Sequence, residues 1–256
     1  MSSTGTPRLR ARAPTDPADA VRRARRVLLV SAAVTLLLYV APLGHLLARP
    51  LLYISTLVHE LGHGLTALLV GGEFYRLEMW SDGSGVAWSA ARGDLQHALI
   101  AAGGLVGPAV AAAAGFALAR RRRSARWALG AIGLLLVWAM IFKIRTGFGL
   151  LVAGALAGAC VAVALRATSD WAQLLLGFLS VQLALSVFSR GDYLFADTAQ
   201  TGAGTGMSDS ASIAELIGGP TWFWGGVCAA ISLAALVFGA WVMLRGVRRS
   251  SGLPAR

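Results

Sequence analysis

Apolar residues along this chain fall in long uninterrupted runs rather than in the narrow stripes of soluble amphipathic helices. A run of about 20 apolar residues is long enough to cross the hydrocarbon core of a bilayer as a helix. The pattern therefore predicts an all-α polytopic membrane protein with about seven transmembrane helices. The predicted helices lie near residues 27–47, 51–70, 95–119, 127–142, 147–165, 171–189 and 221–244.

Two polar intervals interrupt this series. Residues 71–94 include an alternation of period two from Phe74 to Trp80, followed by the turn-forming sequence Asp-Gly-Ser-Gly and a short apolar return. That pattern predicts a small β-hairpin over residues 73–90. Residues 190–220 are rich in Gly, Ser, Thr and Asp, and they predict a polar loop or a short re-entrant piece.

The runs indicate a single transmembrane domain over residues 27–244. A basic tail precedes it at residues 1–26, and a second basic tail follows at residues 245–256. The first run has the length of a signal peptide, but a long tail precedes it and no small-residue cleavage site follows its apolar core. An uncleaved membrane anchor is the better interpretation.

Composition agrees with a membrane protein. Hydrophobic residues make up 56% of the 256 positions and charged residues 14%, whereas soluble domains carry about 25% charged residues. Cys160 and Cys228 lie inside apolar runs, which predicts buried thiols rather than a disulfide or a metal site. Gly103 and Gly107 form a G-x-x-x-G pair that predicts close helix packing.

The net charge of +11 comes from arginines that gather in the tails and between the runs. This distribution predicts contact with anionic lipid headgroups. It argues against nucleic-acid binding, because neither an aromatic-interleaved basic motif nor a Cys/His finger accompanies it. Lys and Arg divide almost evenly between the two membrane sides, and the basic tail beside the first run favours a cytoplasmic N-terminus in the plasma membrane.

The run at residues 51–70 contains the sequence His-Glu-Leu-Gly-His, from His59 to His63. Two histidines four residues apart lie on the same face of a helix. They can bind one tetrahedral Zn²⁺ and leave room for a third protein ligand and a water. Glu60 lies about 100° around the helix from His59, so its carboxylate reaches the water without binding the metal.

This arrangement predicts hydrolysis of a carbonyl compound by a zinc-activated water, with Glu60 accepting the proton as general base. It also explains why ionisable residues stand in an apolar run, where they are costly, since coordination compensates the loss of hydration. A pair of structural histidines that bond neighbouring helices is the simpler alternative. It would leave Glu60, which stands between His59 and His63, without a role.

The sequence HELGHGLTALLVGG, followed by EFYRLEMWSDGSGVAWSA, resembles the site-2-protease group of intramembrane zinc metalloproteases. The likeness is strongest to the compact branch that lacks a PDZ insert, and it extends from about Leu51 to Trp224. The resemblance implies a zinc metalloendopeptidase acting on membrane-spanning substrates. It implies that His59 and His63 are zinc ligands and that Glu60 is the catalytic base.

The resemblance also implies a third zinc ligand, an aspartate in an Asn…Leu-Asp-Gly pattern. This chain departs from the pattern, because it contains neither an asparagine nor Leu-Asp-Gly. Asp192 is favoured, because Gln182, Ser186 and Ser189 form a polar stripe that Asp192 continues at helical spacing, and the span count returns Asp192 to the side of the predicted hairpin. Asp209 is the alternative, in a segment that looks like the Ser-Asp-Ala…Leu-Ala…Trp stretch of the compact branch.

The predicted hairpin would capture an unwound substrate if the substrate added a strand to its edge. Phe74, Tyr75, Leu77 and Met79 are then candidate substrate contacts, whereas in the alternative the hairpin is a plain connection. Two other classes remain for the whole chain: a non-catalytic zinc-stabilised membrane scaffold or regulator, and a transporter, although no internal repeat is visible. Glu60 distinguishes the classes, because a structural metal site does not require a base.

Overall fold

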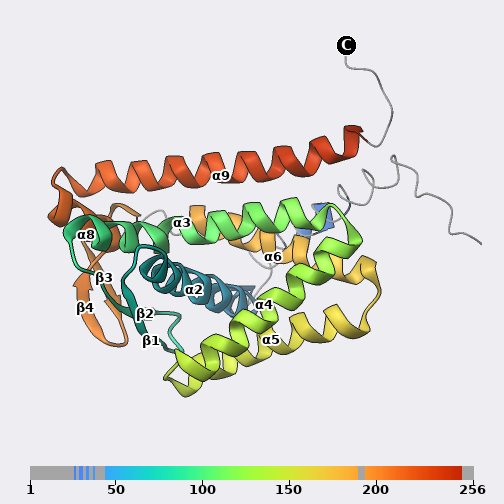
Figure 1. Ribbon diagram of the computed structural model, residues 1–256, viewed down its shortest axis with the longest axis horizontal. Coiled ribbons are helices and arrows are strands. Elements are labelled where there is room, and N and C mark those ends of the chain that lie inside the picture. Colours follow the sequence, from blue (N-terminus) through green and yellow to red (C-terminus); the bar gives the residue numbers. More distant parts are fainter. Residues whose placement is uncertain are drawn as a thin grey trace, which may run out of the picture.

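The computed structural model describes residues 44–189 and 194–249, together with residues 26, 29, 30, 33, 34 and 37. The described part is mostly helical, with two small antiparallel sheets. In Figure 1 the long helices form a bundle, and both hairpins lie with α8 at one end of it. The helices are α2 (Gly44–Leu69), α3 (Asp94–Ala119), α4 (Arg122–Phe142), α5 (Gly147–Arg166), α6 (Ser169–Ser189), α8 (Asp209–Ile217) and α9 (Thr221–Arg249). The strands are β1 (Glu73–Met79), β2 (Gly85–Ala90), β3 (Thr198–Thr201) and β4 (Gly204–Met207).

Among the described helices, α3, α4, α5, α6 and α9 are long and apolar enough to cross a membrane. They coincide with five of the predicted runs, so the chain is a multi-pass membrane protein. α2 is also long, but it carries the ionisable residues of the motif. Most of the first predicted run, residues 27–47, lies outside the described residues, and the count of about seven spans stays a prediction. Cys160 and Cys228 are buried and unpaired with each other, as expected.

The boundary predicted between the first two runs is wrong. α2 begins at Gly44 and continues through Pro50, so it includes residues that were assigned to the first run. A proline removes one helical hydrogen bond and usually marks a helix end. Membrane helices tolerate it where neighbouring groups satisfy the freed carbonyl, and here the helix extends on both sides of the proline.

α2 lies at the centre of the bundle, against α3, α5, α6 and the first hairpin (Figure 1). Glycines allow α2 and α3 to approach closely. A Cβ atom on Gly62 would lie 2.4 Å from the carbonyl oxygen of Gly103, and one on Gly107 would lie 3.2 Å from the Cα of Gly62. The predicted G-x-x-x-G pair therefore serves helix packing.

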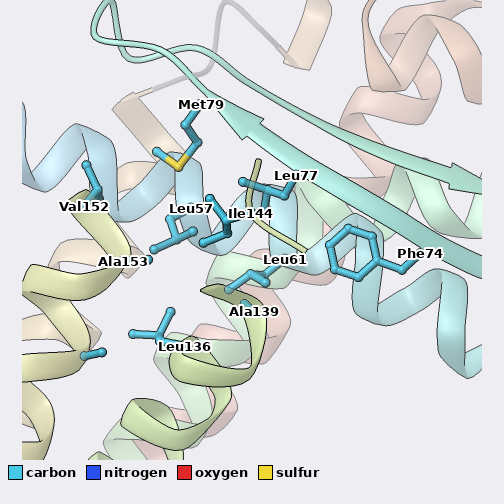
Figure 2. Close-up of a cluster of buried hydrophobic side chains, with 11 residues drawn as sticks. Leu57, Leu61, Phe74, Leu77, Met79, Leu136, Ala139, Ile144, Val152 and Ala153 are labelled. Carbon is cyan, nitrogen blue, oxygen red and sulfur yellow. The ribbon is translucent and has the colours of Figure 1, made fainter. Parts of the chain in front are cut away.

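β1 and β2 form the predicted hairpin within residues 73–90. Strict alternation would place Phe74 on the opposite face from Leu77 and Met79. A register shift between Phe74 and Arg76 inserts an extra residue, so all three apolar side chains point into one core, packed on α2, α4 and α5 (Figure 2). Their side chains are almost completely buried, and they anchor the hairpin to the bundle.

The outer edge of β1 is also occupied. The N–H of Leu77 donates to the carbonyl of Lys143 at 2.9 Å, and the N–H of Arg145 donates to the carbonyl of Leu77 at 3.0 Å. Ile144 thereby forms a parallel bridge with Leu77. Because β1 is flanked by β2 on one side and by this segment on the other, the unpaired edge of the sheet within the described residues belongs to β2.

The interval 190–220, predicted as a polar loop or a short re-entrant piece, contains regular structure in its described part. β3 and β4 form a second antiparallel hairpin, and α8 follows directly. The hydroxyl of Ser208 accepts a hydrogen bond from the N–H of Ala211 at 3.1 Å, and it caps α8. The strands are short and composed of small residues, so they lack the alternation of large apolar side chains that identifies a strand in a sequence.

Candidate metal site

α2 places His59, Glu60 and His63 together in the interior of the bundle, where all three are buried. The Nε2 atoms of His59 and His63 lie 3.2 Å apart, and the two rings are nearly perpendicular, at 89°. The spacing of four residues along the helix therefore brings the two imidazoles to one point, as the motif predicts.

Asp209 reaches the same point from α8. Its Oδ2 atom lies 3.1 Å from Nε2 of His59, and its Oδ1 atom lies 3.4 Å from Nε2 of His63. One ligand atom from each of the three side chains lies within 4.8 Å of the others. Within the described ranges, His59, His63 and Asp209 form a group that could hold a metal ion.

Local structure at the start of α8 sets the position of Asp209. The Ser208 hydroxyl donates to the carbonyl of Ala196, and the Ser208 N–H donates to the carbonyl of Asp197 at 3.0 Å. These bonds tie the first turn of α8 to the segment before β3. Asp209 is the first residue of the helix, where the positive end of the helix dipole favours a carboxylate.

Charge also favours the ionised form of Asp209. Burial raises the pKa of its carboxyl group, but the neighbouring His63 and His59 outweigh burial and hold that pKa below its usual range. An ionised carboxylate offers oxygen lone pairs to a cation. At neutral pH the group is therefore ready to act as a ligand.

His63 is oriented from the opposite side. Its Nδ1 atom lies 2.8 Å from the carbonyl oxygen of Ile100 on α3. Because a carbonyl only accepts hydrogen bonds, Nδ1 carries the proton, and Nε2 of a neutral ring keeps its lone pair for a metal. A Cβ atom on Gly104 would lie 2.1 Å from Nε2 of His63, so this glycine makes room for the ring.

The donor set fits zinc. Two imidazole nitrogens and one carboxylate oxygen are a three-ligand set of catalytic zinc sites, which keep a fourth position open. Oδ2 of Asp209 is buried and makes no hydrogen bond to any described residue. When His63 is neutral, its Nε2 lone pair faces the carboxylate. A cation between these electron-rich atoms would turn their repulsion into coordination.

Glu60 lies between this group and β2. A Cβ atom on Gly85 would lie 2.8 Å from Cγ of Glu60 and 3.0 Å from its Oε1 atom. The backbone N–H of Ala87 also interacts with the Glu60 carboxylate. Glu60 is not a member of the group of three, and it lines the same cleft as that group and residues 85–89 of β2. This is a suitable position for a general base.

The site opens into a cleft of about 660 Å³, a volume within the range of about 300–1,000 Å³ usual for ligand sites. His59, Glu60, His63 and Asp209 line its inner end. Residues 85–89 of β2 line one side, and residues of β3 and β4 also line it, together with parts of α3 and α8. Residues from two hairpins and three helices, α2, α3 and α8, therefore line the cleft.

Four of the residues predicted from the sequence lie together at the cleft. His59, Glu60 and His63 lie together, and Asp209, the alternative third ligand, lies with them. Asp192 is outside the described residues. The predicted substrate contacts Phe74, Leu77 and Met79 are buried in the core, where they have no surface for a substrate, and Tyr75 is exposed.

Two parts of the site were not found from the sequence. The cleft is lined by β2 rather than by β1. The glycine at position 85 is the feature of the sequence that could have indicated this, because β2 passes so close to Glu60 that no side chain fits there. The second hairpin, residues 198–207, also lines the cleft. Its run of Thr, Ala and Gly residues has no apolar alternation, so no pattern in the sequence indicated a strand.

A family model described as Peptidase M50B-like matches residues 29–239. The matched range contains the three converging side chains, Glu60 and both hairpins. No curated protein and no solved structure matches the chain.

Proposed function

The chain belongs to the Peptidase M50B-like family, and from that premise we propose that it is a zinc metalloendopeptidase that hydrolyses peptide bonds of membrane-spanning substrates. Membership supports a membrane metalloprotease at the level of the family. One observation supports the finer assignment: His59, His63 and Asp209 converge beside Glu60 at the inner end of a cleft. This combination provides a metal site, a base and space for a substrate.

In this proposal His59, His63 and Asp209 hold the zinc. Zinc bound there would supply Lewis-acid chemistry, lowering the pKa of a water and polarising a carbonyl. Asp209 takes the place of third ligand because its two oxygens face the two histidines at 3.1 and 3.4 Å. The role predicted for Asp192 from the sequence is decided by the zinc measurements below.

The remaining chemistry belongs to side chains of α2. Glu60 accepts the proton of the attacking water and delivers it to the amine that leaves. The carbonyl of Ile100 keeps the proton of His63 on Nδ1, so the ring does not compete with Glu60 as an acid. Burial of all three α2 side chains limits competing water and strengthens electrostatic interactions at the reacting bond.

The substrate would bind in an extended form along the outer edge of β2. That edge is the unpaired one in the described sheet, and residues 85–89 line the cleft. Backbone hydrogen bonds from a strand edge do not depend on substrate side chains, so this mode suits a protease acting on an unwound membrane segment. Tyr75 remains a candidate contact from the exposed side of the hairpin.

For localisation we propose the plasma membrane with a cytoplasmic N-terminus, supported by the basic tail beside the first run. Trp127 and Trp171 are exposed by 70% and 64%, near the α3–α4 and α5–α6 connections. Exposed tryptophans mark the headgroup level of a membrane protein. The arginines of the α3–α4 connection, around residues 120–123, would contact anionic headgroups at that level.

The test compares wild type with Glu60→Gln, each reconstituted in vesicles with a set of single-span model peptides. Products are identified by mass spectrometry, and zinc is measured in both proteins. The amide is nearly isosteric, so zinc should stay unchanged, while cleavage should fall by at least about 100-fold because the amide cannot accept the proton. Wild-type cleavage by Glu60→Gln would exclude this residue as the base. Stoichiometric zinc in a wild type that cleaves none of the peptides would favour the non-catalytic scaffold.

A further inference from the structure

The second hairpin lines the cleft with residues of both of its strands. Antiparallel pairing places Ala199 opposite Gly206 and Thr201 opposite Gly204. Directly opposed residues share a face of a sheet, so these four residues form one face, which we name the small-residue wall. All four line the cleft, and Thr205 and Met207 on the other face of β4 line it as well. On β3, Thr198 and Gln200, which alternate with Ala199 and Thr201, are exposed and are not part of the lining.

The small-residue wall leaves space where side chains would normally project. A Cβ atom on Gly206 would meet no atom within 4 Å, and the same holds for Gly204. Gly204 has a φ angle of +121°, which glycine adopts without strain. Gly206 has no such angle, so its lack of a side chain is not explained by backbone conformation. The space in front of it belongs to the cleft.

The two hairpins meet at their tips. The N–H of Gly202 donates to the hydroxyl of Ser84 at 3.0 Å, and a Cβ atom on Gly202 would lie 2.2 Å from the indole ring of Trp80. Ser84 is itself held by the Asp82 carboxylate, which accepts from its hydroxyl at 2.7 Å. This contact fixes the β3–β4 turn against the β1–β2 turn at one end of the cleft.

From this geometry we infer that the small-residue wall determines which substrate side chains the cleft admits. An extended segment bound along β2 projects alternate side chains to either side. The two glycines of the wall leave open space in front of them, so the wall has room there for large apolar side chains of the substrate. The inference deepens the proposed function and rests on it: the substrate class is an extended membrane segment with bulky residues facing Gly206.

The first experiment measures binding to the zinc-loaded full chain by calorimetry. Three probes are used: acetohydroxamate, which reaches only the metal, and two tripeptide hydroxamates that differ in carrying Ala or Phe side chains. Gly206→Leu fills the open space, and Gln200→Leu adds the same side chain on the opposite face of the hairpin. The wild type and Gln200→Leu should bind the Phe probe more tightly than the Ala probe.

Gly206→Leu should bind the Phe probe at least tenfold more weakly than wild type, with unchanged zinc content and unchanged affinity for acetohydroxamate. Those two unchanged values show that the variant is folded around its metal site. Thr201→Leu, on the same wall, should repeat the loss. Wild-type affinity of Gly206→Leu for the Phe probe would overturn the inference.

A second measurement keeps the inference separate from the proposed function. Gly206→Cys and Gln200→Cys are labelled with a small and a bulky maleimide, and the two native cysteines are buried. Gly206→Cys should react with the small reagent and at least tenfold more slowly with the bulky one, whereas Gln200→Cys should react with both. Absence of zinc from the wild type would refute the proposed function. Equal labelling of the two variants would refute the inference that the small-residue wall limits which side chains the cleft admits.

Discussion

The candidate metal site joins two helices of very different kinds. α2 is 26 residues long, lies at the centre of the bundle, and brings His59 and His63 together through its own repeat. α8 is 9 residues long, follows a hairpin of small residues, and contributes Asp209 alone. A helical spacing positions two of the candidate ligands, whereas a cap and the docking of a short helix on α3 and α9 position the third.

This difference indicates how the site can fail. A change on α2 removes ligands from a rigid core element and should eliminate metal binding. A change on α8 should weaken metal binding, and the loss of affinity should grow as the helix docks less firmly on the bundle. Short helices depend on tertiary packing for their stability. Substitutions on the two helices distinguish these outcomes.

Removing both imidazoles of α2 should abolish zinc binding. In His59→Ala/His63→Ala one carboxylate remains of the proposed three ligands, which is insufficient for a zinc site. Elemental analysis of the purified protein should then find no stoichiometric zinc. His97→Ala is the matched control, because His97 lines the cleft but is not in the group of three, and it should keep one zinc per chain. Stoichiometric zinc in the double variant would refute the assignment.

Removing the charge on α8 should weaken zinc binding without eliminating it. Asp209→Asn keeps the shape of the side chain and leaves both histidines in place, so we expect a loss of about 10–100-fold in zinc affinity. Competition with a calibrated chelator measures this value. Asp192→Asn is measured in parallel and should match wild type. The opposite pattern, with zinc lost from Asp192→Asn and kept by Asp209→Asn, would place the third ligand at Asp192.

The fit of His63 against α3 can be disturbed without touching a ligand. Gly104→Ala introduces a methyl group 2.1 Å from Nε2 of His63, so the ring must move, and zinc affinity should fall by about tenfold. Gly158→Ala is the control, because a Cβ atom there meets nothing within 4 Å. It should leave zinc unchanged and raise stability by about 0.5–1 kcal/mol, as expected for Gly to Ala in a helix. Equal zinc affinity in both variants would show that Gly104 does not hold the ring.

Removing the cap of α8 should change zinc binding only slightly. Ser208→Ala removes the acceptor for the N–H of Ala211, at a cost of about 1 kcal/mol, which corresponds to about fivefold in zinc affinity if docking of α8 and metal binding are coupled. Hydrogen exchange should accelerate in residues 209–217 and slow again in excess zinc. If exchange accelerates and excess zinc does not slow it, α8 and the metal are independent.

The elements that follow a pattern repeating over a few residues could be predicted from the sequence alone. Five apolar runs predicted α3, α4, α5, α6 and α9, and the spacing of His59 and His63 predicted their convergence. The hairpin over residues 73–90 was predicted as well, although the bulge beside Phe74 changed which side chains face the core. A bulge adds one residue to one strand, and the alternation of apolar and polar residues in the sequence does not reveal where that happens.

Which aspartate lies beside the two histidines depends on tertiary structure, so the candidate for the third ligand could not be chosen from local sequence patterns. The stripe that favoured Asp192 includes Ser186, which lines a small cavity with His59, while Asp192 itself lies outside the described residues. The position of Asp209 depends on a hairpin of Gly, Ala and Thr residues and on the Ser208 cap. Neither feature shows an apolar pattern, and the distance along the chain between His63 and Asp209 indicates nothing about their contact.

X-ray absorption at the zinc edge, measured on wild type and Asp209→Asn each loaded with one zinc, identifies the atoms bound to the metal. For wild type we predict two imidazole nitrogens at about 2.0–2.1 Å and oxygen ligands at about 2.0–2.2 Å. For Asp209→Asn we predict the same two imidazoles and a changed oxygen shell. A wild-type spectrum without imidazole scattering, or identical spectra for the two proteins, would contradict a site built from His59, His63 and Asp209.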